Sequence, residues 1–326
     1  MELKLGSIPV KVQGWFVLMA LFLGANEGNP LKLGIWVGIV LVSVLLHELG
    51  HALMGKAFGL DPRIELHGMG GTTSFSSSVP RGPLGNGKRI AISLAGPFAG
   101  FGFAAIVFVA QAAGLQPRHP LSIHAVSLLF AVNVGWGIFN LLPMLPLDGG
   151  DVLRSGLDAL SKKNGERIAR YVSVVVAACL SLYAVRQQAW WILYLGVLFA
   201  FRNVQAIHKD AQDRANQSLV DSIQNAHDAL EGGDSKRAIA LLQPAFVPGA
   251  STDVRQVGLR IWISALLTEG QASEAADLIE RERILVPTED LARYAKVLRD
   301  HGDTETADRV DSLQQVPSTE LAAFRT

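Results

Sequence analysis

Long apolar stretches follow one another through the first two thirds of the chain. Most are near or above the roughly 20 residues that a helix needs to cross a hydrocarbon layer about 30 Å thick. The stretches cover the following ranges: Ile8–Ala25, Leu31–Phe58, Ile90–Gly114, Leu121–Leu142, Ile168–Val185 and Ala189–Val204. The first is the weakest because it contains Lys11 and Gln13, and the last two are short. The pattern predicts an all-α, polytopic membrane protein with about six transmembrane helices.

A period of two residues interrupts the helical pattern between the second and third stretches. Residues Arg63–His67 and Thr72–Ser76 alternate in polarity around Gly68, Gly70 and Gly71. Alternation on either side of a glycine-rich turn predicts a short β-hairpin.

Beyond His208 the chain becomes charged and rich in alanine, with helical periodicity and no strand pattern. Three segments align on Gly233, Gly270 and Gly302, and each has an alanine five residues later. The spacings of 37 and 32 residues are near the 34 of tetratricopeptide repeats, although the usual Trp and Tyr positions are missing. We therefore predict a membrane domain over residues 1–207 and a soluble, tetratricopeptide-like helical domain over 208–326. The alternative is an ordinary helical tail.

Composition excludes several other classes of protein. Charged residues make up 18% of the 326 residues and hydrophobic residues 49%, whereas about 25% charged residues is usual. With 29 basic and 29 acidic side chains the net charge is zero, so no overall positive field attracts nucleic acid. Cys179 is the single cysteine, which excludes a disulfide scaffold.

Lys and Arg are distributed unevenly over the short connections. Fourteen of them fall on the side of the N-terminus and of the loops after the second and fourth stretches, and three fall opposite: Lys32, Arg118 and Arg186. The positive-inside rule places the richer side in the cytoplasm, together with everything after residue 208. This orientation needs an even number of spans. A multipass chain without disulfides suits a bacterial inner membrane.

A metal-binding pattern lies inside the second stretch, in the run His47-Glu48-Leu49-Gly50-His51. Two histidines at i and i+4 lie on one face of a helix, so both imidazoles can bind one Zn²⁺. Glu48 is then close enough to take a proton from a water molecule at that ion. Ionisable residues inside a membrane are costly and usually mark a functional site. The alternative is a polar cluster that packs helices together.

A catalytic zinc ion needs a third protein ligand, and the run FNLLPMLPLDGGDVL after the fourth stretch offers Asp148. The predicted orientation places it in the same leaflet as the two histidines. Pro143 and Pro146 break the helix there, and unwound backbone at membrane depth is tolerated only where it is buried or lines a wet cavity. A hydrolase inside a membrane requires such a cavity.

Together these motifs resemble the site-2 protease family of intramembrane zinc metalloproteases. The resemblance rests on HELGH, on AGP at Ala95–Pro97 and on N-x-x-P-x-x-P-L-D-G at Asn140–Gly149, and it covers roughly residues 10–205. It implies one zinc ion per chain. The implied zinc ligands are His47, His51 and Asp148; the implied base is Glu48; and the residue implied to position the substrate carbonyl or stabilise its oxyanion is Asn140.

Two positions depart from the family pattern. Gly100 stands where members often have Asn, so a polar contact between spans is missing. Asp151 stands where relatives commonly have a basic residue, and an acid three residues after Asp148 can compete with it as a ligand. The loop Gly59–Gly87 has only 29 residues, too few for a PDZ-like domain, so the C-terminal repeats are the expected site of regulation.

Other polar or small residues have simpler interpretations. Asn133 lies seven residues before Asn140, on the same helical face, and either lines the cavity or packs helices. Gly96 and Gly100 form G-x-x-x-G, which indicates close helix packing. His67 is expected to be a hairpin or solvated residue and not a fourth ligand.

The resemblance implies hydrolysis of a peptide bond in the transmembrane segment of a membrane protein, as in regulated intramembrane proteolysis. The substrate helix must unwind locally, because helical hydrogen bonds hide its peptide groups. An exposed strand edge can hold an extended peptide, so the hairpin is expected to bind the substrate through four residues: Gly70, Gly71, Thr72 and Thr73. Expected partners are this substrate, membrane lipid and a cytosolic protein docked on the repeats.

Two other functions compete with proteolysis. An inactive membrane scaffold would bind partners through the repeats, but the intact HELGH and Asp148 argue against it, since an inactive member should have lost one of them. A metal-binding transporter or channel is the other alternative. Glu48→Gln distinguishes it, because hydrolysis should not survive that change and transport can.

Overall fold

The computed structural model describes residues 1–76, 84–160, 164–246 and 249–315. The chain forms two compact units, one over Met1–Ala206 and the other over Ile207–Thr326. The first unit contains the small β-sheet and the most apolar helices, and the second is helical.

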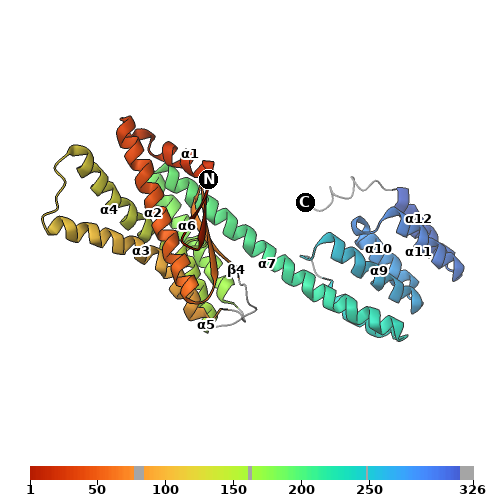
Figure 1. Cartoon of the computed structure of the whole chain (residues 1–326). Helices are drawn as coiled ribbons and strands as arrows, with labels where there is room; N and C mark the ends of the chain where they lie inside the picture. The colour runs from red at the N-terminus through yellow and green to blue at the C-terminus, as the bar shows by residue number, and fades with distance from the viewer. Residues whose placement is uncertain (77–83, 161–163, 247–248, 316–326) are drawn as a thin grey trace. The chain divides into compact units, whose positions relative to one another are not determined.

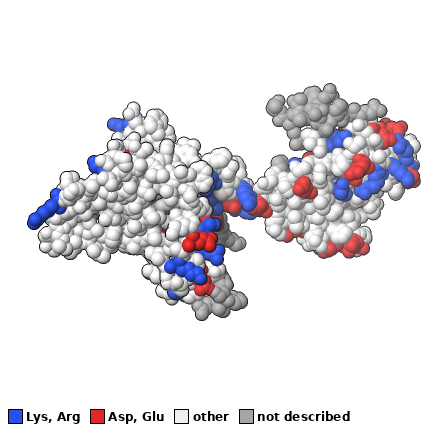
Figure 2. Space-filling view, turned by 45° about the horizontal axis from the view of Figure 1, so that its top comes forward, with Lys and Arg blue, Asp and Glu red and all other residues white. Residues whose placement is uncertain are grey.

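Five helices in the described residues are long and apolar enough to cross a membrane (Figure 1): α2 (Pro30–Ala57), α3 (Asn86–Ala112), α4 (Pro120–Asn140), α6 (Gly165–Arg186) and α7 (Trp190–Glu231). Two of them begin at a proline, which suits the first helical position because it has no N–H to leave unpaired. In α2 the Asn29 side chain caps this start by accepting a hydrogen bond from the Leu31 N–H at 2.8 Å. Figure 2 shows a broad surface of the first unit without Lys, Arg, Asp or Glu, as contact with hydrocarbon requires.

The predicted first span over Ile8–Ala25 is wrong. Residues Ile8–Val12 form strand β2, and only Gly14–Leu23 form a helix, α1, of 10 residues. At 1.5 Å per residue such a helix is about 15 Å long, half the thickness of the hydrocarbon layer. The physical reason is visible in the run IPVKV, where apolar residues alternate with Pro9 and Lys11 and thus follow the period of a strand.

The predicted hairpin is confirmed and is part of a larger sheet. Strands β3 (Asp61–His67) and β4 (Gly70–Ser76) are antiparallel, with His67 opposite Gly70. Strand β2 pairs in parallel with β3, and β1 (Glu2–Leu5) pairs with β2. The strand order β1-β2-β3-β4 places β4 at an edge.

The sheet packs on α2 through a small apolar core. Ile64 and Leu66 of β3 are fully buried, as is Ala52 of α2, and Val10 and Val44 are nearly so. Val44 and Ala52 of this core stand four residues before and after Glu48, on the same face of α2. The sheet is therefore fixed directly over the middle of α2.

The chain is unwound between the end of α4 at Asn140 and the start of α5 (Asp148–Leu160). Its backbone polar groups are partly satisfied by neighbouring helices: the Leu145 N–H donates to Ser173 Oγ of α6, and Asn203 Nδ2 of α7 donates to the Leu145 carbonyl, both at 2.8 Å. Gly150 lies so close to the turn that a Cβ would meet the Leu145 nitrogen at 2.4 Å. These contacts hold the start of α5 in place.

The second unit consists of short helices after the last part of α7: α8 (Ser235–Ala245), α9 (Thr252–Thr268), α10 (Ala272–Arg281), α11 (Thr288–Asp300) and α12 (Thr304–Ser312). The turns α7–α8, α9–α10 and α11–α12 contain the three aligned glycines, with φ of +78°, +77° and +86°. The alanines five residues later are fully buried, so they allow close approach of helices. The tetratricopeptide assignment itself stays a prediction. Three short 3₁₀ helices complete the described elements: η1 (Ala25–Glu27), η2 (Arg283–Leu285) and η3 (Leu313–Gln315).

Candidate metal centre

Helix α2 brings two imidazoles together in the interior of the first unit. His47 and His51 are one turn apart and only 4% and 7% exposed. Their Nε2 atoms lie 3.1 Å from each other, so the lone pairs or protons of both rings are directed at the same small volume.

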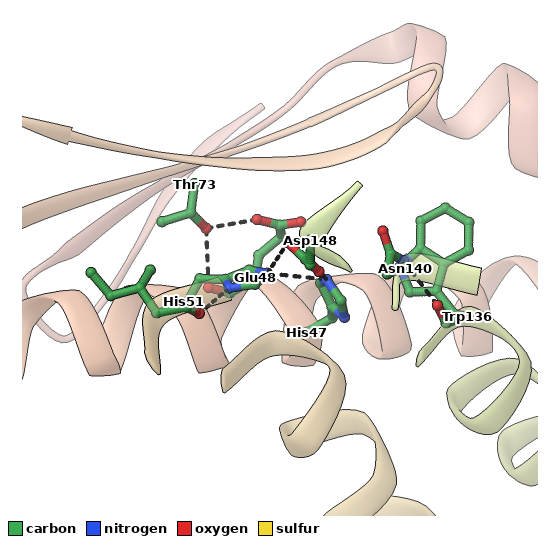
Figure 3. A network of polar contacts seen from close by, with 8 residues as sticks. His47, Glu48, His51, Thr73, Trp136, Asn140 and Asp148 are labelled. Atoms are coloured by element: carbon green, nitrogen blue, oxygen red, sulfur yellow. Dashed lines mark hydrogen bonds and ion pairs between the residues drawn. The ribbon is translucent and has the colours of Figure 1, made fainter. Parts of the chain in front are cut away.

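Asp148 is the third member of the cluster (Figure 3). Its Oδ2 lies 3.1 Å from His47 Nε2 and its Oδ1 lies 3.3 Å from His51 Nε2. The three side chains each offer an atom within 4.8 Å of the others, and among the described residues they form the one group of this kind that can hold a metal ion. Residues about 100 positions apart in the sequence thus meet because the unwound segment turns α5 back towards α2.

The donor set fits a zinc ion, because zinc takes imidazole nitrogen and carboxylate oxygen and a catalytic site keeps three protein ligands. His51 Nδ1 lies 2.7 Å from the Ile92 carbonyl of α3, so Nδ1 carries the proton and Nε2 is left as the ligand atom. Asp148 Oδ2 is buried and, apart from its 3.1 Å contact with His47 Nε2, has no partner among the described residues, which is costly unless a cation or a proton is shared there.

Close helix packing holds the His51 ring in this position. A Cβ on Gly96 of α3 would lie 2.2 Å from His51 Nε2, and a Cβ on Gly50 would lie 2.3 Å from the Ala95 carbonyl oxygen. The AGP motif therefore supports the histidine pair from the side of α3, and Gly96 has a more specific role than general helix packing.

Asp151 is outside the cluster that can hold the ion. Its carboxylate Oδ1 lies 2.9 Å from Arg154 Nη2, one turn further along α5. Burial raises the pKa of Asp151, while Arg154 opposes that shift. The structure thus gives Asp151 another partner.

Glu48 is 5% exposed and faces strand β4 (Figure 3). The Thr73 hydroxyl lies 2.7 Å from Glu48 Oε2 and 3.1 Å from the Glu48 carbonyl oxygen. A Cβ on Gly71 would lie 2.5 Å from Glu48 Cγ, so only glycine lets the strand approach the carboxylate this closely. The edge strand of the sheet is packed directly on the side chain predicted to be the base.

Three further candidate residues, Asn140, Asn133 and His67, have hydrogen-bond partners outside the metal cluster. Asn140 is 9% exposed, and its Nδ2 donates to the Trp136 carbonyl at 2.9 Å. Asn133 donates to Ser43 Oγ of α2 at 2.9 Å, a contact that packs α4 on α2. His67 Nε2 lies 2.8 Å from the Thr72 hydroxyl, so the structure gives both residues a partner within the hairpin and keeps His67 out of the metal cluster.

Sequence reasoning missed Ser173 and Asn203, the two residues that bind the unwound backbone at Leu145. Both are buried, at 0% and 2% exposure. A signal was present, because a buried polar side chain in an apolar helix is expensive and needs a partner. Ser173 and Asn203 stand in the fifth and sixth apolar stretches, where they interrupt the apolar pattern.

Comparison with known proteins points to metalloproteases. The model of peptidase family M50 matches residues 114–184, a segment that includes Asp148. A zinc metalloprotease of Methanocaldococcus jannaschii is 28% identical over 185 residues, which is 55% of this chain and 50% of that protein. A Synechocystis protein with a provisional zinc metalloprotease name is 32% identical over 175 residues, which is 47% of this chain and 44% of that protein.

The chain thus spans about half the length of these curated relatives, or less. Among solved structures, the site-2 protease from Methanocaldococcus jannaschii is similar, with a TM-score of 0.46 and 25% identity over 64% of this chain and 94% of that one. The family model and the relatives support a zinc metalloprotease related to peptidase family M50. The cluster of His47, His51 and Asp148 can hold the metal ion.

Proposed function

We propose that the chain is an intramembrane zinc metalloprotease of the site-2 type, which hydrolyses a peptide bond in the transmembrane segment of a membrane protein. The observation that carries this proposal is the meeting of His47, His51 and Asp148 in one cluster that can hold a metal ion. The cluster stands on a helix long and apolar enough to cross a membrane, and Glu48 adjoins it.

His47 and His51 would hold zinc through Nε2 and Asp148 through its carboxylate. When bound, the ion supplies Lewis-acid activation of water and of the scissile carbonyl. The chain orients the His51 ring for this role. The Ile92 carbonyl contacts His51 Nδ1, and Gly96 packs closely against the ring.

Glu48 is the proton carrier in this proposal. Because the Thr73 hydroxyl lies at Oε2, Oε1 is the oxygen left to accept the proton of the attacking water. The water oxygen bonds to the carbonyl carbon, the C–N bond breaks, and Glu48 returns the proton to the leaving nitrogen. Asn140 would donate to the carbonyl oxygen as negative charge develops on it, an effect worth about 3 kcal/mol in comparable sites.

The free edge of β4 supports a role in holding the substrate. A locally unwound substrate segment can pair with this edge through main-chain hydrogen bonds, along Gly70, Gly71, Thr72 and Thr73. Since Gly71 lies against Glu48, a peptide on this edge is carried past the base.

In the wider proposal the chain is a multipass protein of a bacterial inner membrane with the site towards the cytoplasm. Cleavage then releases a cytosolic fragment, which is regulated intramembrane proteolysis. The helices after residue 208 would dock a cytosolic protein partner, and the bilayer lipid surrounds the first unit.

Metal content and cleavage of a model transmembrane substrate test the proposal. Purified wild type should hold about one zinc per chain and cut the substrate. Glu48→Gln should keep the zinc without cutting, and Asp148→Ala should lose the zinc. A folded wild type without zinc would contradict the proposed protease function and would favour the inactive membrane scaffold.

A further inference from the structure

A cavity of about 380 Å³ lies beside the candidate active site. It is bounded by α1, α2, α4, the start of α7 and the turn between β3 and β4. Apolar side chains form most of its wall, among them Phe16, Met19, Val44, Leu128, Trp136 and Leu195. Among the described residues of the wall, His67 is the one with an ionisable side chain, and it is hydrogen-bonded to Thr72.

The size and polarity of the cavity indicate the kind of group that fits it. An apolar protein cavity of about 150 Å³ is enough to hold a benzene molecule. The cavity therefore has room for an aromatic or a long aliphatic side chain. Among the described residues, its wall has no Asp, Glu, Lys or Arg side chain to pair with a charged side chain.

Strand β4 connects the cavity to the candidate base. Gly70 is part of the cavity wall, and a Cβ there would lie 3.0 Å from Trp136 Cζ2. Gly71, the next residue, packs against Glu48. Because a strand advances about 3.3 Å per residue, a peptide that passes Glu48 on this edge reaches the cavity within one or two residues.

Trp136 links the cavity to Asn140 as well. Its main-chain carbonyl accepts the hydrogen bond of the Asn140 side chain at 2.9 Å. Its indole Nε1 is buried and has no acceptor among the described residues. An unwound substrate has main-chain carbonyls without partners, and one of them would satisfy this donor.

We propose that this cavity is a specificity pocket for a large apolar side chain, aromatic or aliphatic, of the substrate within two residues of the scissile bond. The inference rests on the proposed function. A membrane acyl chain has the same polarity, but the continuity with Gly70, Gly71 and Asn140 places the cavity along the path of the peptide.

The test uses the full chain and model transmembrane substrates that differ at one position near the cleavage site, with Phe, Leu or Ala there. Wild type should prefer Phe or Leu over Ala by about tenfold or more in kcat/KM at one position, since a few methylenes in an apolar pocket are worth this much. Ala131→Phe adds a ring to the cavity wall on α4. It should reduce the preference to about threefold or less while retaining cleavage of the Ala substrate.

Ser127→Phe is the matched control, because Ser127 is an exposed residue of the same helix outside the cavity wall. It should keep the wild-type preference. Measurable but equal rates for all three substrates in wild type, or an unchanged preference in Ala131→Phe, would overturn the pocket.

A binding experiment separates failure of the pocket from failure of the protease. A benzophenone-bearing amino acid at the same substrate position is photo-crosslinked to the full-length Glu48→Gln protein, which needs no cleavage. Adducts on Met19, Met69 or Leu128 would support the pocket even if wild type cuts nothing. Adducts only on residues outside the cavity wall, or crosslinks of the substrate to lipid alone, would overturn it.

Discussion

At the scale of single residues, the contact between Thr73 and Glu48 is the most testable. The Thr73 hydroxyl, 2.7 Å from Glu48 Oε2, fixes which carboxylate oxygen is left for the proton. Thr73→Val should lower kcat about 10- to 100-fold, because a hydrogen bond to a charged group is worth about 1.5–3 kcal/mol. KM should change by less than about threefold, as steady-state cleavage kinetics would show.

Thr73→Ser should restore most of the rate, since it retains the hydroxyl. Ser74→Ala is the matched control on the same strand, because the Ser74 hydroxyl faces the Arg63 carbonyl at 3.4 Å and not the base. Full activity in Thr73→Val would show that the hydroxyl has no part in positioning Glu48.

Gly96 and Gly100 differ in how closely they pack, and zinc affinity can be compared between their alanine variants. A Cβ there would lie 2.2 Å from His51 Nε2, whereas at Gly100 the nearest atom would be 3.4 Å away. Gly96→Ala should therefore weaken zinc binding about 10- to 100-fold, the size of effect seen when the support of a metal ligand is lost. Gly100→Ala should retain zinc, and competition with a chelator measures both. Equal affinities would show that α3 can move aside at no cost.

Residue patterns predicted the metal-binding side chains of the cluster better than the residues that hold those side chains in place. His47 and His51 at i and i+4 on a helix have a fixed geometry, so a local rule is enough to pair them. Thr73, Ser173 and Gly96 act through contacts with distant segments, and no local pattern specifies which segments meet. Their roles follow from tertiary placement and not from the local sequence.

At the scale of elements, the unwound segment before α5 depends on hydrogen bonds from α6 and α7. Ser173 Oγ accepts from the Leu145 N–H at 2.8 Å, and its removal leaves a buried donor unpaired. Ser173→Ala should destabilise the first unit by about 1–3 kcal/mol and weaken zinc binding through Asp148. Thermal unfolding in detergent and zinc titration measure the two effects.

Ser181→Ala, on the same helix, is the control for Ser173→Ala. Ser181 Oγ donates to the Ala177 carbonyl of its own helix at 2.8 Å, so its removal leaves no backbone N–H of another described element without an acceptor. Equal stabilities of the two variants would contradict a supporting role for Ser173.

Element types were predictable where the period was long and regular. The helices that contain the second to sixth apolar stretches are present, and the hairpin was recognised from its alternation and its glycines. Strand β2 was predicted as part of a span because Ile8–Val12 is followed directly by the apolar helix α1. Averaged hydropathy therefore shows the strand and the helix as one apolar stretch. Strand β1 was missed although it pairs with β2 across the two-residue turn Gly6-Ser7, a connection that favours a hairpin.

At the scale of the whole molecule, the orientation in the membrane is the main expectation to check. The excess of Lys and Arg predicts a cytoplasmic position for residues after 208. This orientation needs an even number of spans, whereas five helices in the described part of the chain are long enough to cross. Single cysteines at Gln187 and Asp234, in a Cys179→Ser background, would report the two sides. An impermeant maleimide should label position 187 in intact cells and position 234 only in inverted vesicles. The reverse pattern would invert the proposed site location.

The parallel pairing of β2 with β3 has a consequence for the order of events during synthesis. Val10 lies opposite Ile64, and the whole of α2, with both histidines, is synthesised between them. At about 5–20 residues per second, β2 leaves the ribosome several seconds before β3. Strand β2 can pair with β1 at once, but its other edge, which pairs with β3, must stay open while α2 enters the bilayer. The helix that carries the histidines is inserted first, and the sheet that covers Glu48 closes over it afterwards.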